Sequence, residues 1–184
     1  PLYSSAASDV YKRQQWTLML RDPEQVAGLP PRALDALAAA AREAGETDAT
    51  ASSGPWLLGL DMPRYLPFLT HAENRDLRET VYRAHVSRAS DGDLDNRSLI
   101  EEILSLRTEQ AERLGYRHWA DVSLATKMAD DVDAVEALLE ELRAAAFPAA
   151  ERELAELKAC AARQGAAEAE TLAAWDVPYW SEQL

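Results

Sequence analysis

The three histidines of this chain, His71, His85 and His118, are the first residues to test for metal chemistry. A protein holds zinc where several imidazole, thiolate or carboxylate groups converge on one point. The His-Glu-x-x-His pattern achieves this on a single helix, because its two imidazoles share a face and its glutamate lies beside the metal-bound water. No such pattern occurs here, and no two histidines are closer than fourteen residues in the sequence. The histidines therefore predict no local metal site.

Pairs of charged groups are the next candidates for acid–base chemistry. His118 and Asp121 could present an imidazole and a carboxylate on neighbouring faces, although a histidine at a helix start, held by backbone or solvent, is the simpler interpretation. Glu101 with Glu102, Glu140 with Glu141, and the cluster 130–133 are interpreted as solvated faces and helix caps, since the chain has 32 acidic residues. The chain has no glycine-rich phosphate loop and no nucleophile elbow. We assign no catalytic or metal-ligating residue and leave the substrate-binding residues open.

Two cations and a set of aromatic residues could contact a ligand. Lys127 and Arg88 could bridge helices through hydrogen bonds or touch the carboxylate of a peptide, and the structural role is favoured. Four aromatic residues could line a peptide groove, although aromatic residues at helical spacing more often form the core. These are Trp119, Trp175, Tyr179 and Trp180. We expect exposed tryptophan surface and marginal folding if partner helices are missing.

Charge and composition exclude several classes of protein. The formal net charge is -13, which disfavours a nucleic-acid surface because such a surface needs clustered Lys and Arg. The longest strongly apolar run, Trp56 to Leu60, is far shorter than the ~20 residues that cross a bilayer. The single cysteine, Cys160, cannot form an internal disulfide and is interpreted as a small packing residue. A cytoplasmic protein fits these features.

Apolar spacing predicts a mainly α-helical fold. Apolar residues recur every three or four positions in most of the chain, and at most one short extended segment is expected, near Trp56–Leu60. Asn74 is a predicted N-cap, and Gly115 is predicted to end a helix in the left-handed conformation. Pro148 should bend or divide the longest helix. The expected helices are 31–44, 75–88, 95–114, 118–128, 130–165 and one beginning near 175.

The two ends of the sequence suggest a fragment. Residues 1–14 look like a translated sequencing-adapter read-through and are treated as non-native, which leaves 15–184 as the helical part to interpret. The chain stops at Leu184 directly after the aromatic segment Trp175 to Trp180, which suggests truncation.

Several phrases then resemble one protein family. Leu-Asp-Met-Pro-Arg-Tyr-Leu-Pro from Leu60 to Pro67 and Ser-Leu-Ala-Thr-Lys-Met-Ala from Ser123 to Ala129 are similar to the region ahead of the catalytic motif in M3, or thimet oligopeptidase, family metallopeptidases. The second phrase looks more like oligopeptidase A than the dipeptidyl carboxypeptidases. Further matching segments follow in the family's order: 77–84, 87–91, 95–96, 101–107, 114–116 and 175–182.

This resemblance implies a fold and a function. Family members have two largely helical lobes that enclose a channel for short peptides, and they carry a zinc ion held by His, His and Glu ligands. The resemblance places those ligands, the general-base Glu, and the Tyr and His that stabilise the oxyanion beyond Leu184. This chain would then supply scaffold and channel wall to a cytoplasmic zinc oligopeptidase, would bind no zinc itself, and would be inactive without the missing catalytic region. A non-enzymatic helical interaction domain is the alternative.

Overall fold

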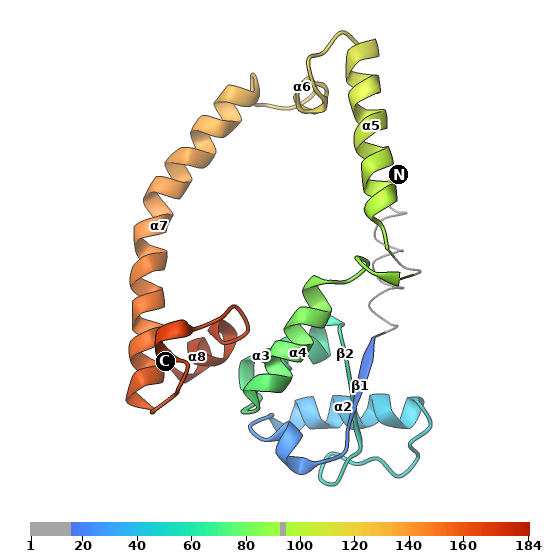
Figure 1. Ribbon diagram of the computed structural model, residues 1–184, viewed down its shortest axis with the longest axis vertical. Helices are drawn as coiled ribbons and strands as arrows, with labels where there is room; N and C mark the ends of the chain where they lie inside the picture. The colour runs from blue at the N-terminus through green and yellow to red at the C-terminus, as the bar shows by residue number, and fades with distance from the viewer. Residues whose placement is uncertain (1–15, 93–94) are drawn as a thin grey trace. The chain divides into compact units, whose positions relative to one another are not determined.

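A computed structural model describes residues 16–92 and 95–184 of the chain, and Figure 1 shows its elements. The described residues separate into two compact units. The first combines residues 16–92 with 157–184, and the second comprises 95–156. The proposed adapter-derived segment 1–14 lies outside the described residues. The predicted mainly helical fold class is confirmed.

Helices form most of both units. The first unit contains the strands β1 (Thr17–Leu20) and β2 (Trp56–Gly59), the 3-10 helix η1 (Pro23–Val26), and the helices α2 (Pro31–Glu43), α3 (Met62–His71) and α4 (Arg75–Val86). The end of α7 (Val132–Arg163), the 3-10 helix η3 (Ala169–Thr171) and α8 (Val177–Gln183) also belong to it. The second unit contains α5 (Arg97–Arg113), α6 (Trp119–Leu124) and the first part of α7.

The expected extended segment is one strand of a two-stranded sheet. β2 pairs antiparallel with β1, and the register places Leu20 opposite Trp56. The sequence analysis expected only the segment at Trp56–Leu60, so β1 is an addition to that prediction. Four residues whose burial does not alternate are too weak a signal to identify a strand without its partner, because the pairing supplies the backbone hydrogen bonds.

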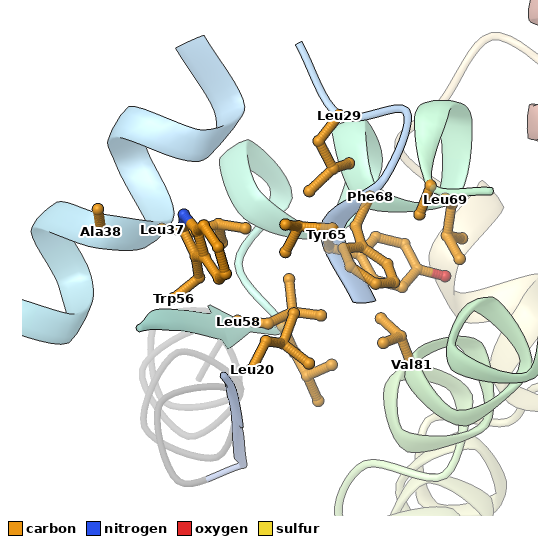
Figure 2. Close-up of a cluster of buried hydrophobic side chains, with 13 residues drawn as sticks. Leu20, Leu29, Leu37, Ala38, Trp56, Leu58, Tyr65, Phe68, Leu69 and Val81 are labelled. Atoms are coloured by element: carbon orange, nitrogen blue, oxygen red, sulfur yellow. The ribbon is translucent and has the colours of Figure 1, made fainter. Parts of the chain in front are cut away.

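A hydrophobic core lies between this sheet and α2, α3 and α4 (Figure 2). Trp56 and Leu58 of β2 are almost fully buried, as is Phe68 of α3. Leu37 contributes from α2 and Val81 from α4. Every element of the first unit up to α4 therefore places at least one apolar side chain in the core. Burial on this scale stabilises the unit by roughly 25 cal/mol for each Å² of apolar surface removed from water.

The junction between α3 and α4 follows from local sequence signals. Pro63 lies in the first turn of α3, where its missing N–H costs nothing. α4 begins after Asn74, whose side-chain oxygen accepts a hydrogen bond from the backbone N–H of Leu77 at 3.1 Å. The predicted N-cap is therefore confirmed. This cap fixes the start of α4 and hence the face on which its arginines lie.

Two features of the second unit test the sequence analysis. Gly115 has φ +78°, and the backbone N–H of Tyr116 donates to the carbonyl of Ala111 at 2.9 Å, which confirms the predicted left-handed helix end. α7 continues without division from Val132 to Arg163 although Pro148 lies inside it. Of the two predicted effects of Pro148, a bend or a division, the division does not occur, and the bend stays a prediction.

Most of the large exposed apolar side chains in the described residues are aliphatic and none is a tryptophan, so the expectation of exposed tryptophan was wrong. Trp56 and Trp180 are 1% and 5% exposed. Large exposed side chains instead lie along α5 and the first part of α7, with Ile103 and Leu142 as examples. In the described part of the chain, no helix has both the length and the apolar character needed to span a membrane.

Candidate functional site

Two arginines of α4 and the aspartate before α8 form a cluster of buried charges. Asp176 is 0% and Arg78 1% exposed, and they are the buried charged residues of the described chain. One Asp176 carboxylate oxygen accepts from Arg75 Nη2 at 2.8 Å, and the other accepts from Arg78 Nη2 at 3.2 Å. We call Arg75, Arg78 and Asp176 the arginine–aspartate cluster. It joins α4 to the segment that precedes α8 within the first unit.

The sequence positions these three groups in a simple way. Arg75 and Arg78 are three residues apart at the start of α4, so their side chains share one face. Asp176 directly precedes the first residue of α8, and the backbone N–H of Ala173 donates to its carboxylate at 3.0 Å. Arg78 also donates to the carbonyl of Ala72 at 2.6 Å. The cluster is therefore held by backbone hydrogen bonds as well as by charge, while the buried Nε of Arg78 has no hydrogen-bond partner among the described residues.

The electrostatics of the cluster keep Asp176 ionised. Burial alone would raise the pKa of its carboxyl group, because a charge is poorly solvated there. The hydrogen bonds from Arg75, the Ala173 amide and Arg78 outweigh burial and hold the pKa below its ordinary value. Asp176 in turn raises the pKa of Arg75. A carboxylate with lowered proton affinity and occupied lone pairs is a poor general base, so the cluster is a structural clamp.

Aromatic rings cover the arginines of the cluster. The Arg78 guanidinium lies 4.1 Å from the centre of the Tyr179 ring. Trp175 lies near two guanidinium groups, that of Arg83 at 4.9 Å and that of Arg75 at 5.7 Å from its ring centre. Such contacts add attraction between the cation and the ring face. Trp175 and Tyr179, which the sequence analysis considered for a groove or a core, here pack against charged side chains.

The remaining predicted aromatic residues have different surroundings. Trp180 belongs to a second buried cluster with Leu157 and Cys160 of α7, so the core interpretation of Trp180 is confirmed. Cys160 is buried in the same cluster, as its interpretation as a packing residue predicts. Trp119, in the second unit, lies with its ring centre 5.5 Å from the Arg107 guanidinium.

The histidines have three separate environments. His71 is the last residue of α3. His85 stacks on Tyr65 with ring centres 4.0 Å apart, and burial raises the pKa of the Tyr65 hydroxyl. His118 precedes α6, where its Nδ1 lies 3.1 Å from a carboxylate oxygen of Asp121. The same carboxylate accepts from the His118 backbone N–H at 3.2 Å, which favours the helix-start interpretation.

The predicted cations make local contacts. Lys127 Nζ lies 2.7 Å from the hydroxyl of Ser123, one helical turn earlier. Arg88 donates to the carbonyl of His85 at 2.5 Å. Glu140 pairs with Arg143 at 2.6 Å on the exposed surface of α7. These contacts fit the structural interpretation of each residue.

The described residues do not fit a bound metal ion. Across 16–92 and 95–184, no three or more His, Cys, Asp or Glu side chains are grouped so that they could hold one. The family resemblance implies zinc, and none of this chain's described residues are assigned to it. The assignment of no catalytic and no metal-ligating residue stays a prediction.

Sequence analysis missed the arginine–aspartate cluster. It considered Trp175, Tyr179 and Trp180, but it gave no partner to Asp176 between them. Arg78 and Asp176 are 98 residues apart, so no local pattern connects them. The available signal was an acidic residue inside an aromatic segment, which is costly to bury unless it is paired.

Comparisons with known proteins give one family match and several similar oligopeptidases. The sequence model of peptidase family M3 matches residues 68–184 of this chain. "Probable cytosolic oligopeptidase A" of Arabidopsis thaliana is 52% identical over 166 residues, which cover 90% of this chain and 24% of the relative. "Oligopeptidase A" of Escherichia coli is 42% identical over 173 residues, with 91% and 24% covered.

A third relative has a different printed name and is less similar to this chain. "Dipeptidyl carboxypeptidase" of Escherichia coli is 31% identical over 169 residues, or 91% of this chain and 24% of the relative. The oligopeptidase A of the same organism is thus clearly more similar, as the phrase at Ser123–Ala129 indicates. The chain spans about a quarter of the length of these curated relatives. With the family description matched over more than half of its residues, the chain belongs to peptidase family M3.

Proposed function

We propose that this chain is part of a zinc-dependent oligopeptidase that hydrolyses short peptides, and that it forms scaffold and channel wall without the catalytic zinc site. The observation that carries this proposal is the similarity to oligopeptidase A over 90% of the chain, at 52% identity in the relative from Arabidopsis thaliana. That similarity includes the buried segments that shape the first unit. The substrates, the zinc and the endopeptidase activity are proposed for the whole protein.

The residues of this chain support a zinc site elsewhere in the whole protein. The sequence has no His-Glu-x-x-His pattern, and its three histidines have separate environments in the described structure. We therefore place the zinc ligands in the part of the relatives' length that this chain does not span. On this proposal the chain alone is inactive and binds no zinc. The cytoplasm is the proposed location.

The scaffold role has a physical basis in the first unit. Its main core and the arginine–aspartate cluster hold the sheet, α3, α4 and α8 together. A channel wall must keep its shape when a peptide binds, because misplacement of about 1 Å in a catalytic site can cost on the order of 100-fold in rate. A buried cluster in which both carboxylate oxygens of Asp176 accept hydrogen bonds from arginines suits that requirement.

A non-enzymatic helical interaction domain remains the second candidate. The exposed aliphatic side chains of α5 and α7 favour it, because contiguous apolar surface commonly marks a protein–protein contact. Ile103 and Leu142, at 47% and 56% exposure, are examples. The same surface would be covered within a complete peptidase.

A chimeric enzyme tests the proposal. Residues 16–184 replace the matched segment of the Escherichia coli oligopeptidase A, and hydrolysis of short peptides is measured with and without a chelator. We expect chelator-sensitive hydrolysis by the chimera, and neither hydrolysis nor stoichiometric zinc in the isolated chain. A folded chimera without activity would refute the enzyme proposal and favour the interaction domain. Hydrolysis or stoichiometric zinc binding by the isolated chain would refute the assignment of the zinc site elsewhere.

A further inference from the structure

One face of α7 carries an apolar stripe that is exposed along the first part of the helix. Its members are Val135, Leu138, Leu139 and Leu142, which we call the α7 stripe. The three leucines are 56%, 59% and 56% exposed. Their spacing of three and four residues places them on one side of the helix. A row of large aliphatic side chains in water is unfavourable, so this surface calls for a covering partner.

The same face of α7 is buried at its other end. Leu142 and Cys160 lie about five helical turns apart and therefore on one side of the helix. Cys160 is 3% and Leu157 7% exposed, because they pack in a cluster with Trp180 of α8. Leu139 and Leu142 thus share a side of α7 with the buried Leu157 and Cys160. Five turns after Val135 and Leu138, the same helix instead carries the exposed residues Glu153 and Glu156.

The second unit does not provide the missing cover. Both clusters of buried hydrophobic residues in the described chain lie in the first unit. In the described part of α5, Ala111 is the buried residue. The other apolar residues of α5 are exposed: Leu99, Ile100, Ile103, Leu104 and Leu106. A unit of this kind needs additional chain to bury its apolar surface.

We propose that the α7 stripe is a docking surface for an amphipathic helix from the part of an M3 peptidase chain that lies outside this sequence. This inference rests on the proposed function. The relatives are about four times as long as the segment they share with this chain, so ample sequence is available to cover the stripe.

Charge argues for this occupant over a second copy of the chain. Glu136 and Glu141 flank the α7 stripe, while Glu140 on the same helix is already paired with Arg143. The whole chain has a formal net charge of -13, so two copies would repel each other when their stripes approached. The occupant should therefore present an apolar face flanked by Lys or Arg.

Paired substitutions in the chimera described above test the docking surface. Leu142→Glu places a charge on the stripe, whereas Ala144→Glu adds the same charge about half a turn away on the exposed side of α7. We expect Leu142→Glu to lower the melting temperature of the chimera by at least several degrees and Ala144→Glu to leave it unchanged. Equal melting temperatures for the two variants would overturn the proposal.

Thiol labelling gives a second readout that does not depend on a disruptive charge. Leu142→Cys and Ala144→Cys are made in the isolated chain and in a chimera whose other exposed cysteines are replaced. Both thiols should react rapidly in the isolated chain. In the chimera the thiol at position 142 should react at least about tenfold more slowly than in the isolated chain. The thiol at position 144 should react as rapidly as in the isolated chain. Rapid labelling at 142 in an active chimera would overturn the docking surface and leave the proposed function intact.

Other outcomes identify other occupants. Protection of position 142 in the isolated chain at all concentrations would mean that this chain covers its own stripe. Protection that appears only at high concentration, with a dimer in sedimentation, would assign the stripe to a second copy. Both results overturn the proposal. A folded chimera that protects position 142 but hydrolyses no peptide would keep the docking surface and refute the proposed function.

Discussion

Arg78 and Asp176 are 98 residues apart in the sequence, yet their side chains meet at 3.2 Å with 1% and 0% of their surfaces exposed. The contact ties the start of α4 to the segment before α8. A buried ion pair of this kind contributes little net stability compared with apolar residues, but removal of one partner leaves a charge unpaired in the interior. Its value for the fold lies in specifying which segments meet.

Replacement of the buried carboxylate should be strongly destabilising. Asp176→Asn leaves the Arg78 guanidinium buried without a counter-charge, and we expect the free energy of unfolding to fall by about 3 kcal/mol. Urea unfolding followed by tryptophan fluorescence measures this change, since Trp56 is buried in the same unit. The control is Glu79→Gln, which removes an exposed pair with Arg83 and should cost at most about 0.5 kcal/mol. Equal effects would contradict the clamp.

The clamp should also give stability a defined pH dependence. The pKa of Asp176 is lowered in the folded state, so its ionisation stabilises the fold above the carboxyl pKa of the unfolded chain, about 3.9. That contribution is lost as the pH falls through the still lower folded pKa. We expect the stability difference between the wild type and Asp176→Asn to be constant from about pH 8 to pH 5 and to shrink below about pH 4. A difference that stays constant down to pH 2 would argue against an ionised Asp176.

The main core predicts a contrast between two neighbours on α3. Phe68 is 1% exposed and Leu66 is 48% exposed. Phe68→Ala removes a large buried side chain and should cost about 3–5 kcal/mol, through lost burial and the cavity left behind. Leu66→Ala should cost under about 1 kcal/mol, because the side chain already contacts water. Denaturant midpoints of the two variants check this order, and a reversal would place the core elsewhere.

The helix cap at Asn74 allows a test with a rescue. Asn74→Ala removes the acceptor for the Leu77 backbone N–H and should destabilise the chain by about 1 kcal/mol. Asn74→Asp keeps an oxygen in that position and should restore most of the loss. Thermal melts of the three proteins compare them directly. If Asp fails to rescue, the side chain stabilises α4 in some other way than by capping.

Structural features that depend only on neighbouring residues, such as helix caps, can be predicted from the sequence. The Asn74 cap and the Gly115 helix end follow from backbone groups that are unsatisfied at helix ends, and both are found as expected. The strand at Thr17–Leu20 and the partner of Asp176 depend on residues far along the chain. No periodicity within one segment encodes such pairings. The exposure of Leu142 likewise depends on which segments pack against α7, and the apolar pattern of one helix does not reveal them.

The scaffold role predicts that the histidines of this chain are dispensable for zinc. In the chimera, His71→Gln and His118→Gln should leave the zinc content at the value of the parent enzyme and peptide hydrolysis within about twofold, because neither side chain belongs to a group that could hold a metal. Metal analysis after dialysis provides a readout separate from activity. The matched control replaces a histidine of the parent's own His-Glu-x-x-His pattern, which should abolish zinc binding. If His71→Gln or His118→Gln also removed zinc from a folded chimera, this chain would contribute to the metal site, and its assignment as scaffold would have to be abandoned.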